Sequence, residues 1–218
     1  IIAGGNEAIL KSAEGVEDSE ELGRNVIHEK GINSKDAVIG ITASGRTPYV
    51  IGAVREAKKS GAFTIGLSSN EASKIKEEAD LAITPIVGPE VVMGSTRMKS
   101  GTAQKLVLNM ITTSVMIKLG KVYGNLMVDL KCNNKKLVDR AIRIIIYAAS
   151  VNEREAEKYL KLSDYNPKTA IVMIKTQSGK IESEKLLKDA DGFVSKAIDL
   201  FYQNKDILGS KKNNSRQK

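Results

Sequence analysis

Short apolar runs alternate with helix-like patterns in the first half of the chain. "DAVIGI", ending at Ile41, and "FTIGLSS", Phe63 to Ser69, predict two buried β-strands, and "LAITPIV", Leu81 to Val87, predicts a third. Residues Pro48 to Ser60 have helical spacing and are followed by Gly61. A strand-helix-strand order with continuous apolar strands is typical of a parallel sheet that is covered on both faces.

The second half of the chain changes to longer and more charged helical patterns. Residues Thr102 to Leu119 predict a long helix, amphipathic or fully buried, that ends at Gly120. After "KVYGNLMVDL" come three candidate helices, "LVDRAIRIIIYAAS", "NEREAEKYLKLS" and "NPKTAIVMIKT". Asn152 and Asn166 stand where N-caps are expected, and a terminal helix is predicted near Ser183–Phe201.

These elements predict an α/β fold, with a parallel sheet flanked by helices and then a small C-terminal helical subdomain. Two helical segments precede the sheet, over "EAILKSAEGVED" and from Ser19 to Glu29. Because three strands are few and the chain opens on "IIAGG", we expect it to begin inside a domain. We expect a partial sheet domain over 1–132, the helical subdomain over 133–202 and a basic, disordered tail over 203–218.

Composition narrows the class of protein. The 218 residues are 41% hydrophobic, enough for a globular core, and no apolar run reaches the roughly 18 to 20 residues of a membrane span. The single cysteine, Cys132, forms no internal disulfide, which is typical of a reducing cytoplasm. Cys132 and the single histidine, His28, offer no metal-ligand spacing. We therefore expect a cytoplasmic protein with no metal and no membrane partner.

The net charge of +8 raises the question of nucleic-acid binding. Half of the excess comes from the segment that begins at Gln203, which has five cations and one anion. The rest of the chain has no tryptophan and no stripe of basic and aromatic residues for stacking bases. We expect no nucleic-acid partner.

The corner Thr42 to Thr47, "TASGRT", joins the first strand to the helix at Pro48. Free N–H groups and the dipole of a helix N-terminus favour an anion, and hydroxyls, glycine and the charge of Arg46 add to this preference. The corner predicts an anion site. The alternative is an ordinary strand-to-helix turn with capping hydroxyls.

Two motifs together carry a family resemblance, "TASGRTPY" and "VGPEVVMGSTRMKSGTAQKLVLNM". With them the chain resembles the sugar isomerase (SIS) superfamily and, within it, the N-acetylmuramic acid 6-phosphate etherases, which are relatives of the glucokinase regulatory protein. The resemblance extends from Ile1 to about Phe201. It implies a cytoplasmic lyase of cell-wall sugar recycling that needs no cofactor and releases D-lactate by elimination and hydration.

The resemblance assigns roles residue by residue. The family's "EGxED" segment falls on Glu14 to Asp18, which makes Glu17 one of two catalytic glutamates, here assigned as the base. The family's phosphate loop S-x-S-G-x-T matches the corner with threonine in first place, so the implied phosphate ligands are Thr42, Ser44, Gly45, Arg46 and Thr47. The second motif supplies candidate substrate contacts at Glu90, Ser95, Arg97 and Lys99, for each of which a bracing role is the alternative.

Part of the family pattern has no counterpart in these 218 residues, namely a "GAGTSGR" loop and an "SECPPT" segment with the other catalytic glutamate. We therefore expect the N-terminal part to be missing and this segment alone to be inactive. Two other functions stay open, a non-catalytic sugar-phosphate-binding regulator like the glucokinase regulatory protein and a sugar-phosphate isomerase of the same fold. In each case the expected partner is a small sugar phosphate, and we expect a homodimer.

Overall fold

A computed structural model gives the fold, and it describes residues 1–11 and 13–214, with side chains as far as Lys205. Contacts divide the chain into two compact units, Ile1–Met110 and Ile111–Lys218. Each unit is described by itself below. The predicted domain boundaries after residues 132 and 202 stay predictions.

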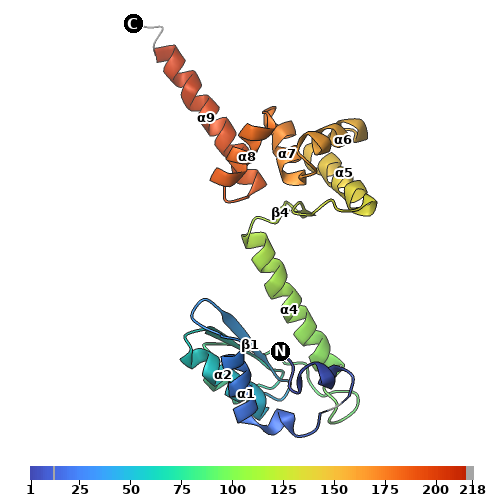
Figure 1. Cartoon of the computed structure of the whole chain (residues 1–218), viewed down its shortest axis with the longest axis vertical. Helices are drawn as coiled ribbons and strands as arrows, with labels where there is room; N and C mark the ends of the chain where they lie inside the picture. Colours follow the sequence, from blue (N-terminus) through green and yellow to red (C-terminus); the bar gives the residue numbers. More distant parts are fainter. Residues whose placement is uncertain (12, 215–218) are drawn as a thin grey trace. The chain divides into compact units, whose positions relative to one another are not determined.

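The first unit is built on a three-stranded parallel sheet with the order β1-β2-β3 (Figure 1). The strands are β1 (Ala37–Ile41), β2 (Phe63–Leu67) and β3 (Leu81–Ile83). The register pairs Ile41 with Leu67 and Leu67 with Ile83, so the carboxyl ends of all three strands lie at one edge. The predicted α/β sheet is confirmed, although β3 ends well before Val87 because Pro85 cannot donate to a ladder.

Helix α2 (Pro48–Lys59) connects β1 to β2 and buries Ile51, Val54 and Ala57. Helix α1 (Glu20–Glu29) packs on α2 at very short range, where a Cβ at Gly52 would lie 2.2 Å from the carbonyl oxygen of Glu20. The short helix α3 (Ile75–Glu78) follows β2. Helices α1 and α2 therefore meet backbone to backbone.

The segment before α1 differs from the predicted continuous helix. It contains two 3₁₀ turns, η1 (Gly5–Ile9) and η2 (Val16–Asp18), and Gly15 between them has a φ of 77°. A left-handed residue at that position ends the regular helical path. The correction matters because η2 carries Glu17.

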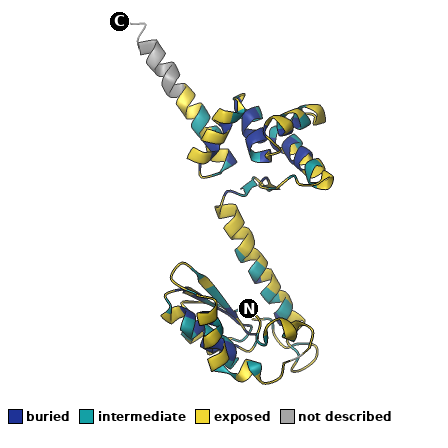
Figure 2. Cartoon of the chain, in the orientation of Figure 1, coloured by how far each residue is buried: buried dark blue, intermediate teal, exposed yellow. Residues whose placement is uncertain are grey.

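Helix α4 (Lys99–Lys118) is the longest helix of the motif region, and it begins three residues before the predicted start. Within it only Ser100 and Val107 are buried, so of the two predicted alternatives, amphipathic or fully buried, the fully buried helix was wrong (Figure 2). Apolar side chains that face solvent include Leu106 and Met110, which are 52% and 60% exposed. Among the described residues no helix is long and apolar enough to cross a membrane.

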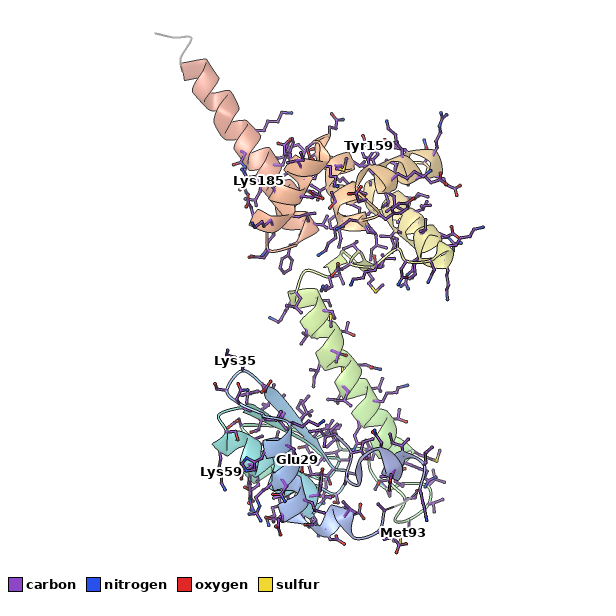
Figure 3. All side chains as sticks on the ribbon, viewed as in Figure 1. Glu29, Lys35, Lys59, Met93, Tyr159 and Lys185 are labelled. Atoms are coloured by element: carbon purple, nitrogen blue, oxygen red, sulfur yellow. The ribbon has the colours of Figure 1, made fainter. Side chains whose placement is uncertain are left out.

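The second unit is a helical bundle introduced by a small antiparallel hairpin, β4 (Val122–Tyr123) and β5 (Leu126–Met127). Its core contains Ile145, Leu160 and Ile171, all at most 1% exposed. Figure 3 shows Tyr159 and Lys185 on two of these helices. The bundle helices are α5 (Lys135–Ala149), α6 (Glu153–Leu162), α7 (Pro167–Thr176), α8 (Lys180–Asp189) and α9 (Val194–Asn214).

The predicted N-caps are confirmed, because the Asn152 side chain accepts the Glu155 N–H and the Asn166 side chain accepts the Thr169 N–H. The single terminal helix near Ser183–Phe201 was wrong, since α8 and α9 are separate helices. Gly192, with a φ of 79°, lies in the turn between them. Helix α9 continues to Asn214, so helical backbone occupies part of the predicted disordered tail, and residues 215–218 lie outside the described residues.

Candidate functional site

The predicted anion corner lies where the sheet's carboxyl edge meets the start of α2. Thr42 is 6% exposed, and its hydroxyl is 2.7 Å from the Thr47 hydroxyl and 3.4 Å from that of Ser44. The Arg46 N–H donates to the Ser44 Oγ at 3.3 Å, while the Arg46 side chain lies exposed. The structure thus brings the three predicted hydroxyls and the exposed cation together in one corner.

Gly45 is required by the path of this corner. Its φ is 72°, and a Cβ there would lie 2.0 Å from the Cβ of Ser73. The Gly45 carbonyl accepts the Ile75 N–H at 3.0 Å, which ties the corner to the segment after β2. A side chain at this position would therefore both strain the backbone and push Ser73 away.

The N-terminus of α2 has donors available for a ligand. Pro48, at its first position, has no N–H, and no hydrogen bond of the described chain takes up the N–H of Tyr49 or Val50. Such groups carry the positive end of the helix dipole and bind anions. The corner hydroxyls and these two N–H groups together can hold a phosphate.

Glu17 lies on the wall of a cavity of about 600 Å³. Thr47 and Tyr49 line the same cavity, as do residues of β1. Burial, followed by the charge of Glu29, raises the pKa of Tyr49, so its phenol stays protonated over a wide pH range. The cavity thus joins one predicted phosphate ligand to the predicted base. The remaining corner residues, Thr42, Ser44, Gly45 and Arg46, are not among its lining residues.

The predicted site residues of the second motif have different surroundings, and Glu90 is bonded to the backbone. Both oxygens of Glu90 accept backbone N–H groups, from Lys99 and from Ser100, each at 3.0 Å. These hydrogen bonds lower the pKa of Glu90, so its carboxyl group is ionised. The ammonium group of Lys99 donates to the Pro89 carbonyl at 2.8 Å. Glu90 therefore braces the start of α4, which was the alternative to a substrate contact.

Arg97 and Lys99 line a second cavity, of about 750 Å³, together with Thr102 and other residues at the start of α4. Ser95 is not among its lining residues, and its N–H donates to the Val92 carbonyl in a turn. Figure 3 shows Met93, which is fully exposed, projecting from the same loop. The motif thus presents two cations to one hollow, while its acid is bonded to the backbone at the start of α4.

The sequence analysis missed a pair of serines. The hydroxyls of Ser69 and Ser100 are 2.8 Å apart, and the Ser69 N–H donates to the Ala43 carbonyl at 3.0 Å. These bonds connect the anion corner to the first turn of α4. A signal was present, since Ser69 lies two residues after the end of β2, at the same sheet edge as the corner.

Comparison with known protein families shows the class of protein to which the chain belongs. The family model of the glucokinase regulatory protein N-terminal SIS domain matches residues 1–58, and that of the C-terminal lid domain of glucokinase regulatory protein matches residues 124–198. The α/β unit with its anion corner and the helical bundle are therefore those of an SIS-type protein with a lid domain.

Curated relatives define the family. An N-acetylmuramic acid 6-phosphate etherase of Clostridium acetobutylicum is 65% identical over 200 residues, 92% of this chain and 66% of that protein. Proteins of the same name from Caldanaerobacter subterraneus, 56% identical over 92% of this chain, and Alkaliphilus metalliredigens, 51% over 95%, are covered to 65% and 67% of their lengths. The chain belongs to the N-acetylmuramic acid 6-phosphate etherase family, and it spans about two thirds of the length of these relatives.

Proposed function

We propose that the full-length protein cleaves the D-lactyl ether of N-acetylmuramate 6-phosphate, giving N-acetylglucosamine 6-phosphate and D-lactate. The observation that carries the proposal is the cavity shared by Glu17 and Thr47, at the edge of a corner that can hold a phosphate. The names of the relatives support the same reaction. They do not favour a non-catalytic regulator, although both family models are named after one.

In this proposal the corner and the N-terminus of α2 bind the 6-phosphate and place the sugar ring over the cavity. Glu17 takes the proton from C2, the C–H electron pair forms the C2–C3 double bond, and the C3–O bond breaks. A second carboxyl group gives its proton to the departing lactyl oxygen. Water then adds to C3, its proton returns to the second carboxyl group, and Glu17 returns its proton to C2. Paired carboxyl groups with different environments suit these two roles.

The reaction belongs to peptidoglycan recycling in the cytoplasm, with a small sugar phosphate as the partner and no cofactor. The protein works as a homodimer. An isomerase of the same fold would bind the same phosphate, so release of lactate distinguishes the two reactions.

The test replaces Glu17 by glutamine in the full-length protein. Glu17→Gln keeps the shape of the side chain but removes its capacity as a base, so lactate release should fall by about a hundredfold or more. Exchange of the C2 proton in deuterated water should fall in parallel, while the affinity for N-acetylglucosamine 6-phosphate should change little.

The matched control is Glu21→Gln, which removes an exposed carboxyl group on α1 a few residues further along. It should release lactate at the parental rate. A Glu17→Gln protein that also released lactate near that rate would contradict the role of Glu17 as the base. A parental protein that released no lactate would refute the proposed reaction itself.

A further inference from the structure

The first three residues of α4 offer no backbone donor to a ligand, although they lie in the motif that resembles a substrate-binding segment. The N–H groups of Lys99 and Ser100 both donate to Glu90. The next two, of Gly101 and Thr102, donate to the carbonyls of Thr96 and Met98 at 3.2 Å and 3.0 Å. The N–H groups of the first three residues of α4 are therefore occupied by groups of the chain itself, and Thr102 begins the regular bonding of the helix.

Helix α2 differs from α4 at this point. The N–H groups of Tyr49 and Val50 in its first turn have no acceptor in the described part of the chain. Both helices begin at the same side of the sheet, since α2 follows the carboxyl end of β1 and α4 is bonded to Ser69 after β2. One helix N-terminus is thus available to an anion, and the other already holds the Glu90 carboxylate.

The Glu90 carboxylate is connected to the anion corner through a short series of hydrogen bonds. It accepts the N–H of Ser100, and the Ser100 hydroxyl is 2.8 Å from that of Ser69. The Ser69 N–H in turn donates to the Ala43 carbonyl, inside the corner. Ser100 is 2% exposed, so water does not readily replace these contacts. A shift of the first turn of α4 would therefore change the geometry of the anion corner.

We propose that Glu90 is a positioning residue, an internal anion that fixes the first turn of α4 and through it the placement of Arg97 and Lys99 in the hollow at the start of that helix. The inference rests on the proposed function for its kinetic readouts only. It assigns the phosphate to α2 and excludes a second substrate anion from the N–H groups of Lys99, Ser100 and Gly101. It also separates Glu90 from the substrate contacts of the second motif.

The test uses two variants of the full-length protein. In Glu90→Gln one side-chain oxygen still accepts an N–H, but the new NH₂ group faces the other N–H, so donor meets donor. Hydrogen exchange at the amides of Lys99 and Ser100 should become about tenfold faster or more. The kcat for lactate release should fall about ten- to a hundredfold because the cations lose their placement. The Kd of inorganic phosphate at the corner should stay within about twofold, since α2 is unchanged.

The second variant, Glu90→Ala, opens room for a small carboxylate. Added acetate should restore part of the kcat and slow the amide exchange again, because an acetate can take the place of the lost side chain at the N-terminus of α4. Glu77→Gln, on the exposed surface of α3, is the control. It should leave both the kcat and the amide exchange at Lys99 and Ser100 as in the parental protein, with or without acetate.

Other outcomes overturn the inference. A large loss of phosphate affinity with unchanged amide exchange would make Glu90 part of the ligand site. A loss of kcat that acetate does not repair, again with unchanged exchange, would place it in the chemistry. If the parental protein released no lactate, only the proposed function would fail, because the amide exchange and the phosphate affinity would still decide the role of Glu90.

Discussion

Asp80 fixes the edge of the sheet that lies opposite the anion corner. One of its oxygens accepts both the N–H and the hydroxyl of Thr64, at 2.9 Å and 2.7 Å, and the other is 2.9 Å from the Lys58 ammonium group. The hydrogen bond from Lys58 and those from Thr64 lower the pKa of Asp80 from 3.8 to about 2. Because Thr64 is fully buried, loss of the Asp80 carboxylate would leave its hydroxyl without an acceptor, although that hydroxyl would still accept the Asp80 N–H at 3.0 Å.

This pKa shift predicts a pH dependence of stability. A carboxyl group whose pKa is lower in the folded state stabilises that state above its unfolded pKa and loses this effect as the pH falls through its folded pKa. Asp80→Asn should therefore lower the free energy of unfolding at pH 7. The difference from the parental protein should shrink as the pH falls from about 4 towards about 2. Urea unfolding of both proteins across this pH range measures the difference. A difference in the free energy of unfolding that does not vary with pH would contradict the prediction.

At the scale of elements, the crossing of α1 and α2 depends on two glycines. A Cβ at Gly23 would lie 2.0 Å from the Tyr49 carbonyl oxygen, and a Cβ at Gly52 would lie 2.2 Å from that of Glu20. Both contacts are with backbone, which cannot turn aside as a flexible side chain can. The approach of the two helices also holds η2, and with it Glu17, beside α2.

Gly52→Ala should therefore destabilise the protein by about 1–3 kcal/mol, the usual cost of overpacking, even though alanine favours helix more than glycine does. Gly101→Ala is the matched control, because a Cβ in that helical position meets only the Thr96 carbonyl, at 3.8 Å. It should be neutral or stabilise by up to about 1 kcal/mol. Thermal or urea unfolding measures both, and equal effects of the two substitutions would rule out the crossing as the cause.

The elements that could be predicted from sequence are those with local signals. The β1-α2-β2 unit follows from two apolar runs around a helix that begins at Pro48, and the cap at Asn166 from an asparagine before a proline. The anion corner could be placed because a strand end and a helix start fix it.

The role of Glu90 could not be predicted in this way. Its bonds reach nine and ten residues along the chain, and the segment between Ile83 and Lys99 has no helical or strand period. The break between α8 and α9 was missed for a similar reason. The left-handed turn at Asp191 and Gly192 interrupts a pattern that otherwise continues as helix.

At the scale of the whole molecule, apolar side chains on α4 remain in contact with solvent. Val115, Met116 and Ile117 are 45%, 48% and 47% exposed. Exposed apolar surface of this kind is typical of a site of association. The proposed homodimer would remove it from water.

Light scattering of the full-length protein should therefore give the mass of a dimer, and added salt should not dissociate it because the contact is apolar. A protein that stayed monomeric at high concentration would contradict this expectation.

Each of the two compact units consists of one continuous stretch of chain, and within the described residues the parallel sheet ends with β3 at Ile83. During synthesis the ribosome releases the residues of the sheet before those of the bundle, and domains generally fold as units in that order. The strands pair across short connections, which favours rapid folding. The β1-α2-β2-α3-β3 segment can thus take up its structure while the bundle is still being translated, so the anion corner does not depend on the last helices for its formation.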